Sequence, residues 1–95
     1  MAYVILATWQ ARAGRERDVA DTIAELTEAS RREPGCRYYQ GQVSIQTPGQ
    51  FVIYEIYDDA AAAEVHSSSD HFRRLVLERA SELLESRSRR IFETV

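Results

Sequence analysis

Apolar residues recur with two different periods in the first third of the chain. Residues 3–10 (YVILATWQ) are branched or aromatic with no breaker, a pattern typical of a β-strand. From residue 15 to residue 33 the period becomes that of a helix, with Val19, Ile23 and Leu26 on one stripe. Pro34-Gly35 follows directly and predicts the end of this helix.

The middle of the chain has the pattern of a β-hairpin. Residues 36–46 read as a strand of more polar type, in which Gly41 marks a bulge or a close approach of another segment. The turn sequence TPGQ at 47–50 leads directly into the apolar run at 51–57. The two strands therefore pair as neighbours.

A second helical region, divided in two, follows the hairpin. One of the two aspartates at 58 and 59 caps a short alanine-rich helix that leads to His66. Ser67 and Asp70 have capping-box spacing and predict the start of a longer helix, which carries apolar residues from Phe72 to Leu84. Residues 89–95 alternate and predict a final strand, and the SRSRR segment at 86–90 reads as a solvated helix end rather than a phosphate site.

The predicted order is β-α-β-β-α-β, which defines a single α+β domain over residues 1–95. This is the ferredoxin-like, split β-α-β arrangement with a four-stranded antiparallel sheet. Helices cover only one face of such a sheet. The other face carries Val4, Leu6, Val52, Tyr54 and Ile56. An apolar patch of this size predicts a homodimer that packs sheet against sheet.

Charge and composition limit which partners the protein can have and which cell compartment it can occupy. The net charge of −3 argues against nucleic acid or an acidic membrane as the main partner. The apolar run at 3–9 is too short to cross a bilayer and has no charged lead, so we expect neither a leader nor a membrane anchor. The lone Cys36 cannot form an internal disulfide and favours a cytoplasmic location. It reads as a small, half-buried hydrophobe.

Glu55 is the polar exception within an apolar strand, and burial of a carboxylate is costly unless it is paired or neutral. By alternation Glu55 and Tyr57 share a face with Phe51 and Ile53, the face expected beneath the helices. A strand glutamate is as often exposed on an edge, so a pocket role and a solvent role both remain open.

Four segments together resemble a known family: VILATWQARAGRE, SRREPGC, FVIYEIYDD and HSSSDHF. The chain is similar to the antibiotic biosynthesis monooxygenase (ABM) domain family of small dimeric α+β barrel proteins, over nearly its whole length. Relatives include quinol and polyketide monooxygenases, haem-degrading enzymes and an isomerase. The resemblance implies a substrate pocket between sheet and helices. It would contain Glu55, Tyr57, His66 and His71, with Trp9, Phe72, Phe51 and Ile53 as walls.

The resemblance is weakest for the haem-degrading branch. That branch uses an asparagine, a tryptophan and a histidine ligand where this chain has Ala7, His66 and Val76. The sequence also lacks a flavin, nicotinamide or phosphate loop, and two histidines five residues apart are not a zinc motif. We therefore expect neither a cofactor nor a metal.

The predicted function is a cofactor-independent monooxygenase that oxidises a small aromatic, quinol or polyketide-type substrate with O2. His66 would be the base, Glu55 would orient it or accept its proton, and Tyr57 and His71 would donate to the substrate oxygen. The same residues would serve an isomerase or cyclase without oxygen. A non-catalytic dimeric binding module, with Glu55 facing water, is the third alternative. In the plainest interpretation Tyr57 and Trp9 belong to the core and His71 only begins a helix.

Overall fold

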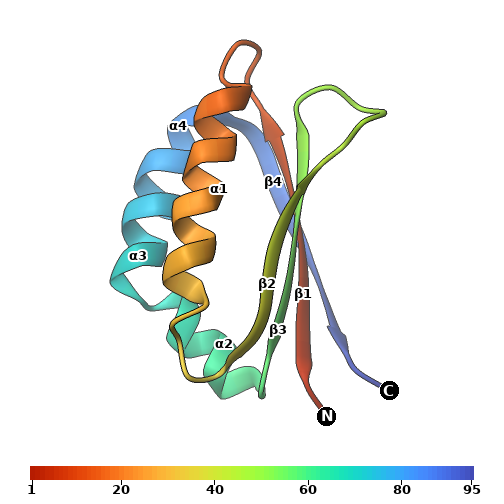
Figure 1. Cartoon of the computed structure of the whole chain (residues 1–95), viewed down its shortest axis with the longest axis vertical. Coiled ribbons are helices and arrows are strands. Elements are labelled where there is room, and N and C mark those ends of the chain that lie inside the picture. The colour runs from red at the N-terminus through yellow and green to blue at the C-terminus, as the bar shows by residue number, and fades with distance from the viewer.

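A computed structural model describes residues 1–95 and confirms the predicted order of elements, with the second helical region divided. No helix is both long and apolar enough to cross a membrane. Segments α3, η1 (of π-helical winding) and α4 run on as one helical stretch against α1 (Figure 1). The elements are β1 (Tyr3–Ala11), α1 (Glu16–Ser30), β2 (Cys36–Val43), β3 (Gln50–Tyr57), α2 (Ala60–Ser67), α3 (Asp70–Phe72), η1 (Arg73–Ala80), α4 (Ser81–Leu83) and β4 (Leu84–Glu93).

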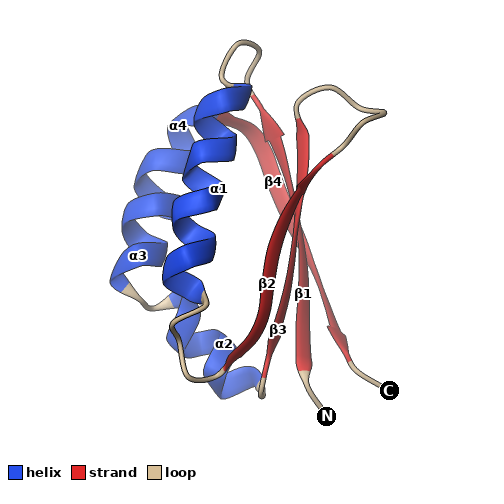
Figure 2. Ribbon diagram, in the orientation of Figure 1, coloured by secondary structure: helices blue, strands red, loops and turns tan.

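The four strands form one antiparallel sheet in the order β2-β3-β1-β4. The predicted hairpin is its β2-β3 edge, and β1 lies between β3 and β4. Its register places Ile5 opposite Glu55 and Trp9 opposite Phe51. All the helices lie on one side of the sheet and leave the other side bare (Figure 2). The fold is therefore the predicted ferredoxin-like α+β arrangement.

The core fills the space between the sheet and the helices. Alternate residues of the central strand, Ile5, Ala7 and Trp9, are buried beneath the helices, as the alternation predicts. The stripe of α1 meets them from above, with Val19 and Leu26 almost fully buried. Helix α1 also comes very close to β2, because a Cβ at Gly41 would overlap the Cγ2 methyl group of Ile23. Gly41 thus marks the close approach that the sequence indicated.

Several boundaries differ from the sequence prediction. Strand β2 ends at Val43 rather than at residue 46, and β4 ends at Glu93 rather than at residue 95. Helix α1 ends at Ser30 rather than 33, since a proline disfavours helical backbone in the residue before it. The cap of the second helical stretch is Ser69 rather than Ser67, which still belongs to α2. Strand β4 begins at Leu84 rather than 89. The SRSRR segment is thus edge strand, and its exposed, polar residues hid the strand pattern.

Candidate active site

The turn between α1 and β2 carries a glutamate, Glu33, into the space beneath α2. The turn is closed by the amide of Cys36, which donates to the Glu33 carbonyl at 3.1 Å. It packs directly on α2, because a Cβ at Gly35 would lie 2.5 Å from the Cβ of Ala62. Only glycine permits this contact without a shift of backbone. The Pro-Gly stop therefore also brings the Glu33 carboxylate to the helix that carries His66.

The break between α2 and α3 positions two histidines toward that carboxylate. Ser69 spans the break: its hydroxyl donates to the His66 carbonyl at 2.6 Å and accepts from the Phe72 amide at 3.2 Å. The other end of α2 is capped by Asp59, which accepts from the Ala62 amide at 2.9 Å. These local hydrogen bonds fix the direction in which His66 and His71 leave their helices.

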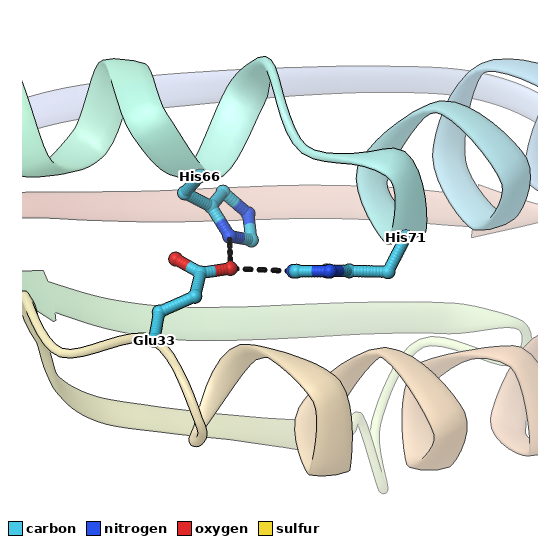
Figure 3. A group of neighbouring side chains, drawn as sticks. All are labelled: Glu33, His66 and His71. Carbon is cyan, nitrogen blue, oxygen red and sulfur yellow. Dashed lines mark hydrogen bonds and ion pairs between the residues drawn. The ribbon is translucent and has the colours of Figure 1, made fainter.

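One oxygen of Glu33 accepts hydrogen bonds from both histidines (Figure 3). His66 Nδ1 lies 2.9 Å and His71 Nε2 2.5 Å from Glu33 Oε2. An ionised carboxylate only accepts, so each of these ring nitrogens carries a hydrogen. In a neutral His66 the other nitrogen, Nε2, then has a free lone pair. The arrangement thus selects the tautomer in which Nε2 is a base.

That free nitrogen lies next to Glu55, which the structure buries at 5% exposure. His66 Nε2 and Glu55 Oε1 are 3.8 Å apart, too far for a hydrogen bond. Glu55 Oε1 instead accepts from the Tyr57 hydroxyl at 2.6 Å. Glu55 does not face water, so the solvent role left open by the sequence is wrong. The free Nε2 of His66, a proton acceptor, and the carboxyl group of Glu55 therefore lie side by side in the site.

Burial shifts the protonation of these groups toward neutral forms. Burial raises the pKa of Glu55 from 4.5 to about 7, against the opposing effects of the Tyr57 hydrogen bond and the charge of Arg89. Burial lowers the pKa of His66 below 6.5, although the Glu33 carboxylate partly offsets it. The pKa of Tyr57 is raised by burial and by Glu55, so its phenol stays protonated. At neutral pH the site thus holds an uncharged imidazole beside a carboxyl group near its titration point.

These groups open into a cavity of about 320 Å³ between sheet and helices. Trp9, Ile53 and Phe72 belong to the apolar and aromatic part of the cavity wall. Glu55 and His66 belong to its polar part. The volume lies at the lower end of ordinary ligand pockets, which suits a compact substrate. The full lining is Ile5, Ala7, Trp9, Leu26, Tyr39, Ile53, Glu55, Ala63, His66, Ser67, Phe72, Val76, Arg87, Ser88 and Arg89.

Not every residue expected at the site lies in the cavity wall. Phe51 packs in the core, outside the wall, and Tyr57 lies behind Glu55, to which it is bonded. His71 also lies outside the wall and is held by Glu33. Tyr57 therefore reaches the cavity only through the Glu55 carboxyl group, and the partner of His71, Glu33, does not line the cavity either.

Sequence reasoning missed several site residues, above all Glu33. Its one signal was its place in the SRREPGC segment, as the last acidic residue before the Pro-Gly stop. Tyr39 was missed because β2 reads as polar, although its ring lies 5.6 Å from that of His66. Arg87 and Arg89 were assigned to a helix end.

The Glu33, His66 and His71 cluster is also the one place where a metal ion has a suitable set of ligands. Its donor atoms lie within 4.8 Å of one another, and two imidazoles with a carboxylate suit iron or zinc. Here, however, the two ring nitrogens are bonded to the carboxylate itself. In this arrangement His66 Nδ1 and His71 Nε2 are both hydrogen-bonded to Glu33 Oε2, whereas Glu33 Oε1 is buried without a partner.

The fold and the buried acid–base groups define a small α+β protein with one cavity between its sheet and its helices. A family model described as Antibiotic biosynthesis monooxygenase matches residues 2–86. The chain belongs to this family, as its sequence motifs suggested. A search of curated proteins gives no significant match.

Solved structures of the same fold cover the whole domain. A protein described as an antibiotic biosynthesis monooxygenase is 30% identical, with a TM-score of 0.90, and the match covers 100% of this chain and 99% of that one. A protein of Shewanella oneidensis is 26% identical, with a TM-score of 0.91 and coverages of 96% and 88%. A conserved protein of Methanosarcina mazei, 22% identical, has a TM-score of 0.93 and coverages of 100% and 94%, and shows the fold alone.

The raised pKa of Glu55 predicts a specific pH dependence of stability. The folded state keeps this proton up to about pH 7, whereas the unfolded chain loses it near 4.5. Wild type therefore loses stability, relative to Glu55→Gln, as pH rises through that window. The advantage of the variant in the free energy of unfolding should grow by about 2–3 kcal/mol. Urea unfolding between about pH 4.5 and 8, at one protein concentration, measures it.

Glu64→Gln is the matched control, because Glu64 is an exposed carboxylate on α2. It removes the same charge without removing a buried group, so its difference from wild type should stay small throughout. A Glu55→Gln advantage that does not change with pH would contradict the assignment.

Proposed function

We propose that this protein is a cofactor-independent monooxygenase acting on a small phenol, quinol or enolisable polyketide-type molecule with O2. The observation that carries the proposal is the free Nε2 of His66, held toward Glu55 in an aromatic cavity. Membership of the family and the 30% identical relative support the same class of reaction.

The first step is removal of a proton from the substrate by His66 Nε2. The resulting imidazolium stays bonded to Glu33 through Nδ1, so the new positive charge faces a carboxylate. Its Nε2–H then donates to the substrate oxyanion. Burial of the imidazole keeps it neutral before the substrate arrives and keeps water from competing. Glu33 is thus a positioning residue and His66 the catalytic one.

The electrons for the reaction come from the substrate alone. The enolate or phenolate gives one electron to O2, and the two radicals combine to a peroxide at carbon. Loss of water from the peroxide then converts a CH2 group into C=O, and the reaction consumes one O2 and releases one H2O. One oxygen atom enters the product and the other leaves as water, so no external reductant is needed.

Glu55 and Tyr57 act together at the other side of the reacting atoms. The Tyr57 hydroxyl is bonded to Glu55, which makes it a support for that carboxyl group rather than a direct donor to substrate. Glu55, with a pKa of about 7, accepts or returns a proton at neutral pH. His71 supports Glu33 in the same way.

The proximity of two proton carriers also favours a second candidate, an isomerase or cyclase. His66 takes a proton from one position of an enolisable substrate and Glu55 returns one at another. Oxygen distinguishes the two functions, because the isomerase would turn over equally well under anaerobic conditions.

Oxygen uptake with a panel of hydroquinones and anthrone-type phenols tests the proposal. His66→Ala should lower the rate by about 10²–10⁴-fold, the usual contribution of an acid–base group. Glu33→Gln should lower it less and move the acidic limb of the pH profile to lower pH, because the Glu33 carboxylate raises the pKa of His66. The exposed Glu28→Gln is the control. Rates within twofold of wild type in His66→Ala would contradict the role of His66.

Uptake should also survive treatment with a chelator, because both histidine nitrogens of the Glu33 cluster are hydrogen-bonded to Glu33 Oε2 and the proposed reaction uses no metal. Loss of uptake on chelation, restored by ferrous ion, would show that the cluster works as a metal site instead.

We further propose that the protein is a homodimer joined through the bare face of the sheet. This face exposes Tyr54 and Phe92 and carries a hollow that Val4 and Leu6 also line. Sedimentation at micromolar concentration should give a dimer, and Leu6→Glu should give a folded monomer or a much weaker dimer. The control is Leu77→Glu, an exposed leucine on the helical side. A wild-type monomer at tens of micromolar would contradict the proposal.

A further inference from the structure

Most arginine side chains of this protein already have a partner. Eight of the twelve hydrogen-bond to a carboxylate or a backbone carbonyl, and the four that do not are Arg17, Arg87, Arg89 and Arg90. Arg90 stacks on Phe92, 5.0 Å from the ring centre. Two of the four residues without such a hydrogen bond, Arg87 and Arg89, line the cavity.

The register of the sheet explains why these two arginines reach the cavity. Arg87 pairs with Trp9 and Arg89 with Ala7, so both side chains lie on the face that the helices cover. Arg90 pairs with Leu6 and faces the other way, toward the bare side. Strand β4 is an edge strand and its arginines are exposed, so the guanidinium groups form an open, polar side of the cavity.

The cavity therefore has three chemically distinct parts. Trp9 and Phe72 belong to an apolar, aromatic wall, and Glu55 and His66 carry the acid–base chemistry. Arg87 and Arg89 form the third part, two residues apart on one strand and thus about 7 Å apart. Arg89 lies close enough to Glu55 to affect its protonation. The charge of Arg89 lowers the pKa of Glu55, against the larger rise that burial causes.

We propose that Arg87 and Arg89 form an anion-binding subsite, and that the substrate combines a compact aromatic or apolar body with a carboxylate or phosphate group. This inference rests on the proposed function for the acid–base chemistry at Glu55 and His66. The body would lie against Trp9 and Phe72 with its reactive carbon near His66. The anion would lie between the guanidinium groups, each of which can donate two parallel hydrogen bonds to two oxygens of a carboxylate or of a phosphate.

The position of the two arginines argues against simpler explanations. An arginine that only kept the surface soluble would have no reason to lie on the cavity side of the strand. Nor do they belong to the proposed dimer face, which is the opposite face of the sheet. An acidic chain of net charge −3 that leaves two cations unpaired at its pocket would draw anionic ligands there selectively.

Calorimetric titration with three naphthalene probes tests the subsite. The probes are 2-naphthoate, 2-naphthyl phosphate and the neutral 2-naphthol, none of which has to react. Wild type should bind at least one anionic probe about tenfold more tightly than 2-naphthol, and raised salt should weaken only the anions. The double variant Arg87→Gln/Arg89→Gln should lose that preference and bind 2-naphthol within about twofold of wild type.

The matched control is Arg17→Gln/Arg90→Gln, which removes two unpartnered arginines away from the cavity and changes the net charge equally. Circular dichroism melting checks that both double variants fold. Three outcomes would overturn the proposal. Wild type could bind the anions and 2-naphthol equally well, or it could bind neither anion at millimolar concentration. The control variant could also lose the preference for anions as fully as Arg87→Gln/Arg89→Gln does.

The affinities of 2-naphthoate and 2-naphthyl phosphate, compared with each other, show whether the subsite prefers a carboxylate or a phosphate. Because binding is measured without turnover, the result is independent of the oxidation chemistry. Selective anion binding in a protein that never consumes oxygen would overturn the monooxygenase and keep the subsite. Oxygen uptake with neutral quinols and no anion preference would do the reverse.

Discussion

The Glu33 carboxylate is the contact on which the site depends, because it receives two histidines from different helical segments in a nearly dry environment. Its side chain is only 10% exposed, and its second oxygen, Oε1, is buried without a partner. A buried charge of this kind is costly unless hydrogen bonds compensate it. The two imidazole N–H groups supply that compensation. In return, the carboxylate fixes the tautomer of His66.

Several features of the fold serve this one contact. Gly35 lets the turn after α1 reach α2, and Ser69 ties the end of α2 to the start of α3. Tyr57 and Glu55 then complete the site from the sheet. Burial of Glu55 works against stability at neutral pH, since its pKa is raised rather than lowered. A costly carboxyl group beside a free imidazole nitrogen is the combination expected of a catalytic site rather than of a structural core.

The fold was predictable because its signals are local. Alternation gave the faces of β1 and β3, the helical stripe gave α1, and TPGQ gave the hairpin. The placement of Glu55 and His66 together was also within reach, because strand alternation and the family resemblance both indicate it. The role of Glu33 could not be predicted, because this residue lies in a turn and acts only through contacts with residues more than thirty positions away. Arg87 and Arg89 were missed because an exposed edge strand has no apolar pattern to reveal it.

The most direct test of the account is the protonation state of the His66 ring, measured by 15N NMR of the imidazole nitrogens in the ligand-free protein at neutral pH. The account predicts a neutral ring with hydrogen on Nδ1 and none on Nε2, and loss of that preference in Glu33→Ala. A ring protonated on Nε2 alone, or a charged imidazolium at neutral pH, would leave no base in the cavity and would contradict it.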